Sequence, residues 1–365
     1  MAKWHPYSRE GTQSRSTSSR GATNAHETKD AAGALAAKVK TRFLIISDTH
    51  DIDLKKYTAS TGVEGCKRLP RTDVVLHCGD LTESGGLDNY KRSIEGLASF
   101  QDAELKLVIA GNHDADLDPE FCEKYGGHAD ALTDDSPEAA SNNNKVFDDS
   151  PLHERALALW KAKMAREAGI VFLEEGTHEF TLKTGATFKV YASPYTPAYG
   201  ISAFQYPTGH DRYNSSGTPA WATNMPTQQT VIHDGTDIVL THGPPKYVLD
   251  GCADGSSGGC EHLARAICRT KPRLHCFGHI HRAWGARRAA WNDQSVQDEI
   301  DLLPEDFVGR NLSKKRGYAS LSPSIYEGLK LGQETLFVNA AVGNDGEGSM
   351  ENVPWVVDLE LETSG

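Results

Sequence analysis

The chain has 365 residues, of which 38% are hydrophobic and 24% charged, and its formal net charge is −12 at pH 7. This length leaves room for one large domain or two ordinary ones, and the composition is that of a soluble globular protein. The negative charge argues against a general nucleic-acid groove, and no apolar run approaches the roughly 18 residues that span a bilayer. The numbers are compatible with an enzyme that holds metal cations in carboxylates.

The first 40 residues are polar and rich in Ser, Thr, Ala, Gly and Arg. Trp4 and Tyr7 are their only aromatic residues, so this segment has too little apolar surface to order itself. We predict a disordered tail over residues 1–40. The start lacks the apolar stretch of a secretory signal, and seven scattered cysteines favour reduced thiols. We therefore expect a cytoplasmic protein, with a mitochondrial transit peptide as the open alternative.

Seven short apolar runs, each bounded by turn residues, predict β-strands. They are rich in Val, Ile and Leu, as strands buried on both faces are. The predicted strands are residues 41–47, 72–79, 104–111, 187–193, 236–241, 273–278 and 335–342.

Three helical patterns lie between these runs, at 85–100, at 150–169 beginning with Pro151, and at 260–270. Strands that alternate with helices argue for one α/β layered catalytic domain, over residues 41–365. Two polar stretches, about 128–150 and 285–324, are predicted to be insertions. The apolar stripes are Leu87, Tyr90, Ile94 and Leu97 in the first helix, and Leu157, Trp160 and Met164 in the second.

Five of the predicted strands end in the same way, because a metal-capable side chain follows the apolar run at once. Ligands bind beyond the carboxyl ends of strands in open α/β sheets, so five such ends predict one shared site. Asp, Asn and His without a thiolate suit Mn²⁺, Fe or Zn²⁺ rather than a structural zinc cage. The residues are Asp48, Thr49 and His50 after the first strand, Asp80 after the second, Asn112, His113 and Asp114 after the third, His242 after the fifth, and His279 and His281 after the sixth.

These candidate side chains outnumber the ligands of a single transition metal, which binds about four to six. It suffices for two metals that share one carboxylate. A metal pair about 3.5–4 Å apart clamps the attacking and leaving oxygens of an in-line displacement. Taken singly, each residue could equally be a polar group at a strand-to-loop turn, and Asp114 could cap the turn that follows it.

The blocks SDTH, GDLTE, GNHD, THGPP and GHIH, in this order, resemble the five signature blocks of the calcineurin-like metallophosphoesterases. The resemblance runs from about residue 43 to residue 344. Finer matches (LTHGPP, KPRLHCFGHIH, GCEHL, SPYTPAYG and VNAAV) are similar to the metallophosphoesterase-domain (MPPED) branch. The resemblance implies a four-layer α/β/β/α sandwich, with two central mixed sheets flanked by helices.

The resemblance also implies a role for each strand-end residue. The family's general acid corresponds to His113, and Asp114 would hold its imidazole, although His113 could also be a supporting group. The first metal would be bound by Asp48, His50 and His281, the second by Asn112, His242 and His279, and Asp80 would bridge the two.

The function implied by the resemblance is hydrolysis of a phosphoester, and more specifically of a phosphodiester. Hydroxide that bridges the metals would attack phosphorus, and His113 would protonate the leaving group. Two divalent metal ions are expected, Mn²⁺ first and Fe or Zn²⁺ as alternatives. The expected partner is a small phosphoester, with a nucleotide among the candidates, and no membrane is expected. A phosphomonoesterase or protein phosphatase, and a non-catalytic interaction module on the same fold, are the alternatives.

Several neighbours of these residues have structural interpretations. We expect the histidines and cysteines inside the apolar runs to be core or supporting residues. We expect the glycines before the ligands to let the backbone approach the metals closely. Aromatic residues near the blocks could stack on a leaving group or pack in the core, and Arg282 could contact phosphate or solvent. These residues are His77, His275, Cys78 and Cys276; Gly79, Gly111 and Gly278; and Tyr195, Tyr199, Phe204 and Trp284.

Overall fold

The computed structural model describes residues 37–58, 69–126, 150–291, 300, 302–305, 308, 310–343 and 350–364. The predicted tail and the insertion at about 128–150 lie outside these residues, except for 37–40 and Ser150. Strand β1 (Lys38–Ile46) already includes the last three residues of the predicted tail.

The first β-sheet has the strand order β15-β1-β2-β3-β4. Strands β1 to β4 are parallel and β15 is antiparallel to β1. Ile46 is opposite His77, which is opposite Val108, so these three parallel strands end level with one another. The residues that follow them therefore emerge at one edge of the sheet. The bounds of the other strands are β15 (Trp355–Glu362), β2 (Val74–His77), β3 (Leu105–Val108) and β4 (Ile170–Phe172).

The second β-sheet has the strand order β13-β14-β12-β11-β6-β5, with four parallel strands between two antiparallel edge strands. All seven predicted strands are therefore present. The strands are β13 (Gly285–Ala290), β14 (Glu334–Asn339), β12 (Leu274–Phe277), β11 (Ile238–Thr241), β6 (Thr187–Ser193) and β5 (Gly176–Thr181).

Strand β13 corrects the expected insertion at 285–324, because its residues pair with β14 along their whole length. Its sequence GARRAA has no continuous apolar run, since an edge strand buries only part of its surface. Ala286 and Ala289 are buried, whereas Arg287 and Arg288 are only partly so.

Alternating side chains of β1 show how the layers are built. Phe43 and Ile45 pack with strands β6, β11, β12 and β14 of the second sheet, in the core between the sheets. Leu44 and Ile46 point the other way and pack with α2 (Leu87–Ala98) and α4 (Leu152–Trp160). Both faces of the strand are buried, which explains its unbroken apolar sequence.

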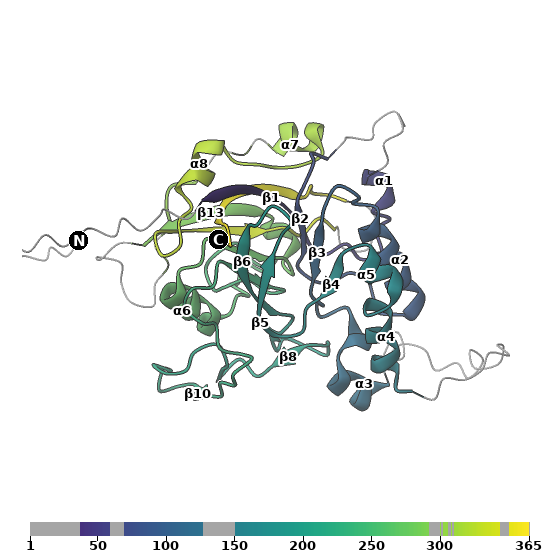
Figure 1. Ribbon diagram of the computed structural model, residues 1–365. Helices are drawn as coiled ribbons and strands as arrows, with labels where there is room; N and C mark the ends of the chain where they lie inside the picture. The colour runs from purple at the N-terminus through teal and green to yellow at the C-terminus, as the bar shows by residue number, and fades with distance from the viewer. Residues whose placement is uncertain are drawn as a thin grey trace, which may run out of the picture. The chain divides into compact units, whose positions relative to one another are not determined.

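Helix α6 (Glu261–Thr270) covers the outer face of the second sheet. Figure 1 shows α2, α4 and α5 on one side of the two sheets and α6 on the other. The four-layer α/β/β/α sandwich is therefore confirmed. The remaining elements are α1 (Lys55–Thr58), α3 (Pro119–Tyr125), α5 (Lys163–Glu167), α7 (Arg310–Arg316) and α8 (Pro323–Gly328), with the short strands β7 (Thr196–Pro197), β8 (Gln205–Tyr206), β9 (His210–Asp211) and β10 (Thr223–Asn224).

The helix predicted over 150–169 is interrupted. Pro151 precedes it as the N-cap, α4 ends at Trp160, and Ala162 has extended backbone before α5 begins. This break changes the direction in which later side chains point. Trp160 is 2% exposed, as expected, but Met164 is 46% exposed and lies outside the predicted apolar stripe.

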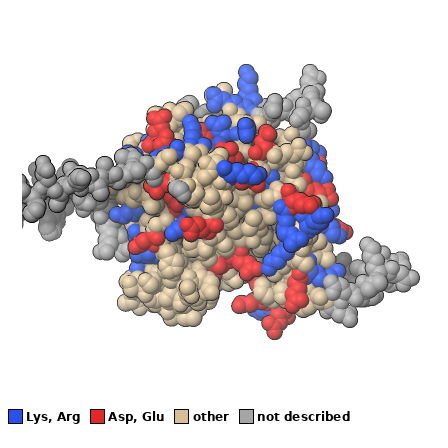
Figure 2. Space-filling view, viewed as in Figure 1, with Lys and Arg blue, Asp and Glu red and all other residues tan. Residues whose placement is uncertain are grey.

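The surface seen in Figure 2 mixes acidic and basic side chains, with basic residues gathered at the top, where Figure 1 places α7. This face does not present the continuous basic stripe that a nucleic-acid groove requires. Among the described residues, no helix is both long and apolar enough to cross a membrane. Cys252 and Cys260, which flank a Gly/Ser loop, are both free thiols.

We expect Phe188→Ala to lower the free energy of unfolding by about 3–5 kcal/mol, because it empties space between the sheets. Phe188 is 1% exposed, and its ring lies 5.6 Å from that of Phe43. Urea unfolding measures the change as a lower midpoint with an unchanged slope. Met164→Ala is the control and should change stability by no more than about 0.5 kcal/mol. Equal losses in the two variants would contradict this account of the core.

Candidate metal centre

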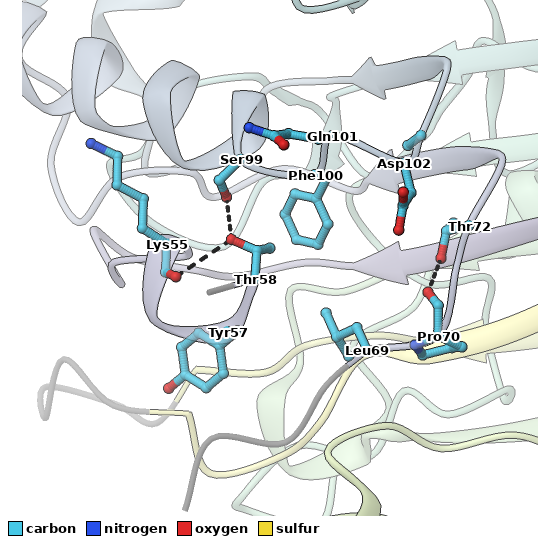
Figure 3. Close-up of a pocket in the computed structure, with 11 residues that line it drawn as sticks. Lys55, Tyr57, Thr58, Leu69, Pro70, Thr72, Ser99, Phe100, Gln101 and Asp102 are labelled. Atoms are coloured by element: carbon cyan, nitrogen blue, oxygen red, sulfur yellow. Dashed lines mark hydrogen bonds between the residues drawn. The ribbon is translucent and has the colours of Figure 1, made fainter. Parts of the chain in front are cut away.

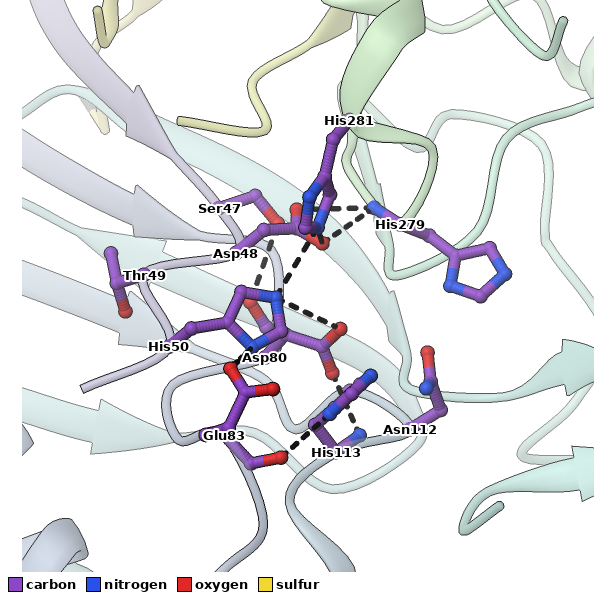
Figure 4. Close-up of polar contacts among 12 residues, drawn as sticks. Ser47, Asp48, Thr49, His50, Asp80, Glu83, Asn112, His113, His279 and His281 are labelled. Atoms are coloured by element: carbon purple, nitrogen blue, oxygen red, sulfur yellow. Dashed lines mark hydrogen bonds and ion pairs between the residues drawn. The ribbon is translucent and has the colours of Figure 1, made fainter. Parts of the chain in front are cut away.

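The carboxyl ends of the two sheets meet where Ser47 follows β1. Its N–H donates to the carbonyl of Ala340, 3.0 Å away, and its own carbonyl accepts from the N–H of Val342 at 3.0 Å. This pairing joins the first sheet to the segment that follows β14. The side chains expected after five separate strands are thereby brought to one place. Figure 4 labels most of them, with His242 and Asp114 as the exceptions.

Asp48, His50 and His281 form the first group of metal-capable side chains. Nε2 of His281 lies 3.2 Å from Oδ1 of Asp48 and 3.2 Å from Nε2 of His50. Their ligand atoms all lie within 4.8 Å of one another. Three donor atoms from two sheets therefore converge on one point.

Asp80, His242 and His279 form the second group, with ligand atoms again within 4.8 Å of one another. Nε2 of His242 lies 3.2 Å from Oδ2 of Asp80 and 2.8 Å from Oδ1 of Asn112. Nδ1 of His242 lies 2.9 Å from the carbonyl oxygen of Cys78. That contact leaves Nε2 to face the other ligands.

Asp80 lies between the two groups, because Oδ2 is also 3.8 Å from Nε2 of His50. In Figure 4 the ring of His279 points away from His281, toward the side where Asn112 lies. The structure thus separates the two neighbouring histidines of the GHIH block into different groups of side chains.

Four residues of these groups have left-handed backbone, which is costly for residues other than glycine. The φ angles are 55° at Asp48, 39° at His50, 51° at Asp80 and 68° at His279. Such strain persists only where surrounding contacts hold it, and it gathers at functional sites. Here the N–H of His279 donates to the carboxylate of Asp48 at 2.9 Å, and the N–H of His113 donates to Oδ1 of Asp80 at 2.9 Å.

The charges of these buried side chains depend on one another. Burial by itself would raise the pKa of Asp48, but the hydrogen bond and positive charge of His281 lower it to about 2. Burial opposes protonation of His50 and His242, yet their contacts with carboxylates raise the pKa to about 10 and about 9, respectively. Burial lowers the pKa of His279 to about 4, so this ring is neutral at pH 7.

Gly111 and Gly278 are required by the ligands themselves rather than by the metals. A Cβ on Gly111 would collide with Oδ1 of Asp80 and would lie 2.7 Å from Cε1 of His242. A Cβ on Gly278 would collide with Oδ2 of Asp48. The close approach expected at these glycines is therefore made by the two central carboxylates.

The donor set fits a pair of divalent cations. Each group combines one carboxylate with two imidazoles, which can bind a metal in their neutral form. Asn112 adds an amide oxygen to the second group. Oxygen and imidazole ligands without thiolates suit Mn²⁺, Fe and Zn²⁺. Asp80 and Asp48 are 2% and 0% exposed, and the charge of Asp80 acts to raise the pKa of Asp48. Two buried carboxylates that repel one another are stabilised by cations.

His113 lies beside the two groups, but its ring is not held by Asp114. Nδ1 of His113 is 2.6 Å from the carbonyl oxygen of Glu83. The Asp114 carboxylate instead accepts hydrogen bonds from the N–H groups of Gly111, Leu81 and Thr82 and from the Thr82 hydroxyl. The expected orienting contact is thus corrected. Asp114 ties the loop after β3 to the loop after β2, because its buried carboxylate finds backbone donors closer than the imidazole.

His77 and His275 are buried in the core, as predicted. Nε2 of His77 lies 3.0 Å from the hydroxyl of Thr49, and Nε2 of His275 lies 2.9 Å from that of Thr241. Burial lowers the pKa of both rings to about 3. They are neutral supports beneath the loops that hold ligands. Cys78 and Cys276 are likewise buried, with 0% exposure.

A cleft of about 1190 Å³ opens over the two groups. His113 and His279 lie at its base, and a Gly/Ser loop over residues 252–260 forms one wall. Tyr199 and Trp221 also line it and are 60% and 59% exposed. Trp221 carried no sequence signal, since it follows a segment with neither an apolar run nor a motif.

The other three aromatic residues near the signature blocks pack instead of lining the cleft. Phe204 and Trp284 are 6% exposed, and the ring of Tyr195 lies 4.0 Å from the Arg212 guanidinium. Tyr199 differs because its ring lies 5.2 Å from that of His279. Arg282 lines the cleft and donates to the carbonyl oxygen of Cys252 at 3.1 Å.

A separate hollow of about 440 Å³ lies between α1 and the end of α2 (Figure 3). The Thr58 hydroxyl donates to Ser99 at 2.6 Å, and the Thr72 hydroxyl donates to the carbonyl of Pro70 at 2.9 Å. The residues that line this hollow include none of the predicted ligands. The predicted ligands that border a pocket, among them Asp80, Asn112, His279 and His281, line the cleft over the two groups instead.

The chain is similar to several known proteins. Metallophosphoesterase domain-containing protein 1 of Homo sapiens is 30% identical over 250 residues, which are 67% of this chain and 62% of that protein. Probable rhamnogalacturonate lyase C of Emericella nidulans is 31% identical over 267 residues, 71% of this chain but only 19% of that protein. The chain thus spans less than two thirds of the length of these relatives. The purple acid phosphatase of Lupinus luteus covers 90% of this chain and 46% of its own, with 14% identity and a TM-score of 0.37.

A family model described as calcineurin-like phosphoesterase matches residues 41–283, which is more than half of the chain. The match includes every residue of the two metal-capable groups, and these groups lie at the strand ends that the fold brings together. The chain belongs to the calcineurin-like phosphoesterase family.

Proposed function

We propose that this protein is a metal-dependent phosphodiesterase that acts on small phosphodiesters in the cleft. The observation that supports this most is the pair of metal-capable groups that converge at the strand ends, with Asp80 of the second group 3.8 Å from His50 of the first. Asp48, His50 and His281 would hold one divalent ion, and Asn112, His242 and His279 the other, with Asp80 between them. Mn²⁺ is the proposed metal, with Fe and Zn²⁺ as the alternatives.

Two metal ions, when bound, supply Lewis acidity at phosphorus and lower the pKa of water toward neutrality. The protein's part is to place the ligands, exclude solvent and move a proton. His113 donates its Nδ1–H to the Glu83 carbonyl, so its other nitrogen, Nε2, can carry the proton that the leaving oxygen receives. Asp114 supports this step indirectly, by fixing the loop that bears His113.

The shape of the cleft favours a substrate with organic groups on phosphorus over a bare phosphate. Tyr199 and Trp221 expose large aromatic faces on its walls, one of them beside the ligand His279. Aromatic walls bury apolar parts of a ligand while a few polar groups fix its orientation. A nucleotide diester is therefore among the candidate substrates, in a cytoplasmic setting.

The first test is the metal content of the purified protein, coupled to a small panel of phosphoesters with added Mn²⁺. We expect about two metal ions per chain, loss of hydrolysis after chelation, and recovery when Mn²⁺ is returned. Bis-aryl phosphate should be hydrolysed faster than mono-aryl phosphate. A strong monoester preference would instead support a phosphomonoesterase.

Substitution of the central residues tests the catalytic assignment. Asp80→Asn should abolish hydrolysis and lower metal content, because it removes the charge shared by the two groups. His113→Ala should lower kcat by about 10²–10⁴-fold for a diester with an alkyl leaving group, and less for an aryl one, which needs no proton.

The exposed His233, outside the cleft, provides the control for these variants. His233→Ala should retain wild-type kcat and metal content. Retained activity in both Asp80→Asn and His113→Ala would overturn this catalytic assignment. A wild-type protein that binds metal but hydrolyses none of the phosphoesters would indicate a non-catalytic module on this fold.

Metal binding should release protons and strengthen as pH rises. At pH 7 His50 and His242 carry protons in the metal-free protein, because their pKa values are raised to about 10 and about 9. A metal binds only the neutral ring, so each of these protons must leave when it is ligated. Calorimetric titration with Mn²⁺ in buffers of different ionisation enthalpy measures the number released. Heats that do not depend on the buffer would contradict the prediction.

A further inference from the structure

Glu83 lies between three of the loops that build the centre, although its own side chain is 57% exposed. Its N–H donates to Oδ2 of Asp51 at 3.1 Å, in the loop after β1. Its carbonyl oxygen lies 2.6 Å from Nδ1 of His113, in the loop after β3. Its carboxylate oxygen Oε2 lies 3.2 Å from Nδ1 of His50 (Figure 4).

The contact with His50 is at the ring nitrogen that does not face the other ligands. Nε2 of His50 points to His281, 3.2 Å away, and so belongs to the first metal-capable group. A neutral imidazole that binds a metal through Nε2 must carry its hydrogen on Nδ1. The Glu83 carboxylate lies within ion-pair distance of Nδ1 without the alignment of a hydrogen bond. A negative charge there favours the tautomer with its hydrogen on Nδ1, restrains the ring and makes Nε2 a stronger ligand.

We propose that Glu83 is a positioning residue that serves both rings at once. Its carboxylate holds His50 in the tautomer and orientation that the first metal requires, and its backbone carbonyl holds His113. The rings of His50 and His113 lie 4.8 Å apart in an edge-to-face arrangement, so one residue can reach both. This inference rests on the proposed function, because it assumes that the first group binds a metal.

The two parts of Glu83 can be separated by mutation. Side-chain variants remove the carboxylate but leave the backbone carbonyl, and hence the contact with His113, in place. Glu83→Ala removes the acceptor from His50, whereas Glu83→Gln keeps an oxygen that can accept from Nδ1–H. The alanine variant should therefore affect the first metal and spare the proton donor.

The test is calorimetric titration of Mn²⁺ into the chelator-treated full-length protein. Wild type should bind two ions, and Glu83→Ala should bind one of them about 10–100-fold more weakly while the other is unchanged. Glu83→Gln should lie closer to wild type than to the alanine variant. Glu95→Ala is the matched control, because Glu95 on α2 is 46% exposed and paired with Lys55 outside the centre. It should bind both ions as wild type does.

Two further readouts exclude a general structural effect. Thermal unfolding of the metal-free Glu83→Ala variant should show only a small loss of stability, because the lost carboxylate faces the buried His50 but is itself largely solvent-exposed. At saturating Mn²⁺, the dependence of kcat on leaving-group pKa should stay that of wild type, since the His113 contact is retained.

The outcomes separate the inference from the function on which it rests. If wild type binds Mn²⁺ and Glu83→Ala binds both ions equally well, the role of Glu83 is wrong and the proposed function stands. Three bound ions that fall to two in Glu83→Ala would also overturn it, because Glu83 would then be a ligand. If wild type binds no Mn²⁺, the proposed metal centre itself fails.

Discussion

The structure is organised around two carboxylates, Asp48 and Asp80, that are buried at the junction of the two sheets. Buried charge is strongly unfavourable unless it is paired and hydrogen-bonded. Each carboxylate accordingly accepts a backbone N–H, from His279 and His113 respectively, and faces imidazole rings from the opposite sheet. Under the proposed function, the same acidic pair would attract the metal ions, so the cost in folding and the capacity to bind metals would have one origin.

The need to pair and hydrogen-bond these two buried carboxylates also explains why the nearby backbone is strained and why glycines lie beside them. Left-handed φ angles at Asp48 and Asp80 let these residues turn sharply at the ends of β1 and β2, so that their side chains point along the sheet edge. Gly111 and Gly278 leave room for the two carboxylates, which a Cβ at either position would strike. Asp114 then fastens the loops together through backbone N–H groups. The strain is held by buried hydrogen bonds rather than by regular secondary structure.

The base and the walls of the cleft are built from different kinds of structure. Its base, with the ligands and His113, lies on strand ends that the four-layer core holds rigidly. Its walls come from the long connections between β6 and β11 and between β11 and α6, which carry Tyr199, Trp221 and the Gly/Ser loop. A family that keeps its ligands on strand ends can change substrates by changing such loops, because loop residues tolerate variation that core positions do not. Under the proposed function, the base of the cleft would carry the chemistry and the walls would carry the specificity.

The sequence by itself determined the seven inner strands and the metal-capable side chains that follow five of them, because an apolar run followed at once by Asp, Asn or His is a local signal. The motif order then assigned the ligands to two groups that the structure brings together. Tertiary structure alone decided what depends on contacts between distant segments. Strand β13 forms because it can pair with the free edge of β14. Helices α4 and α5 are separate, although one apolar pattern predicted a single helix. The Asp114 carboxylate turns to backbone donors, and Glu83 reaches His50 and His113, because the folded loops place those partners nearest.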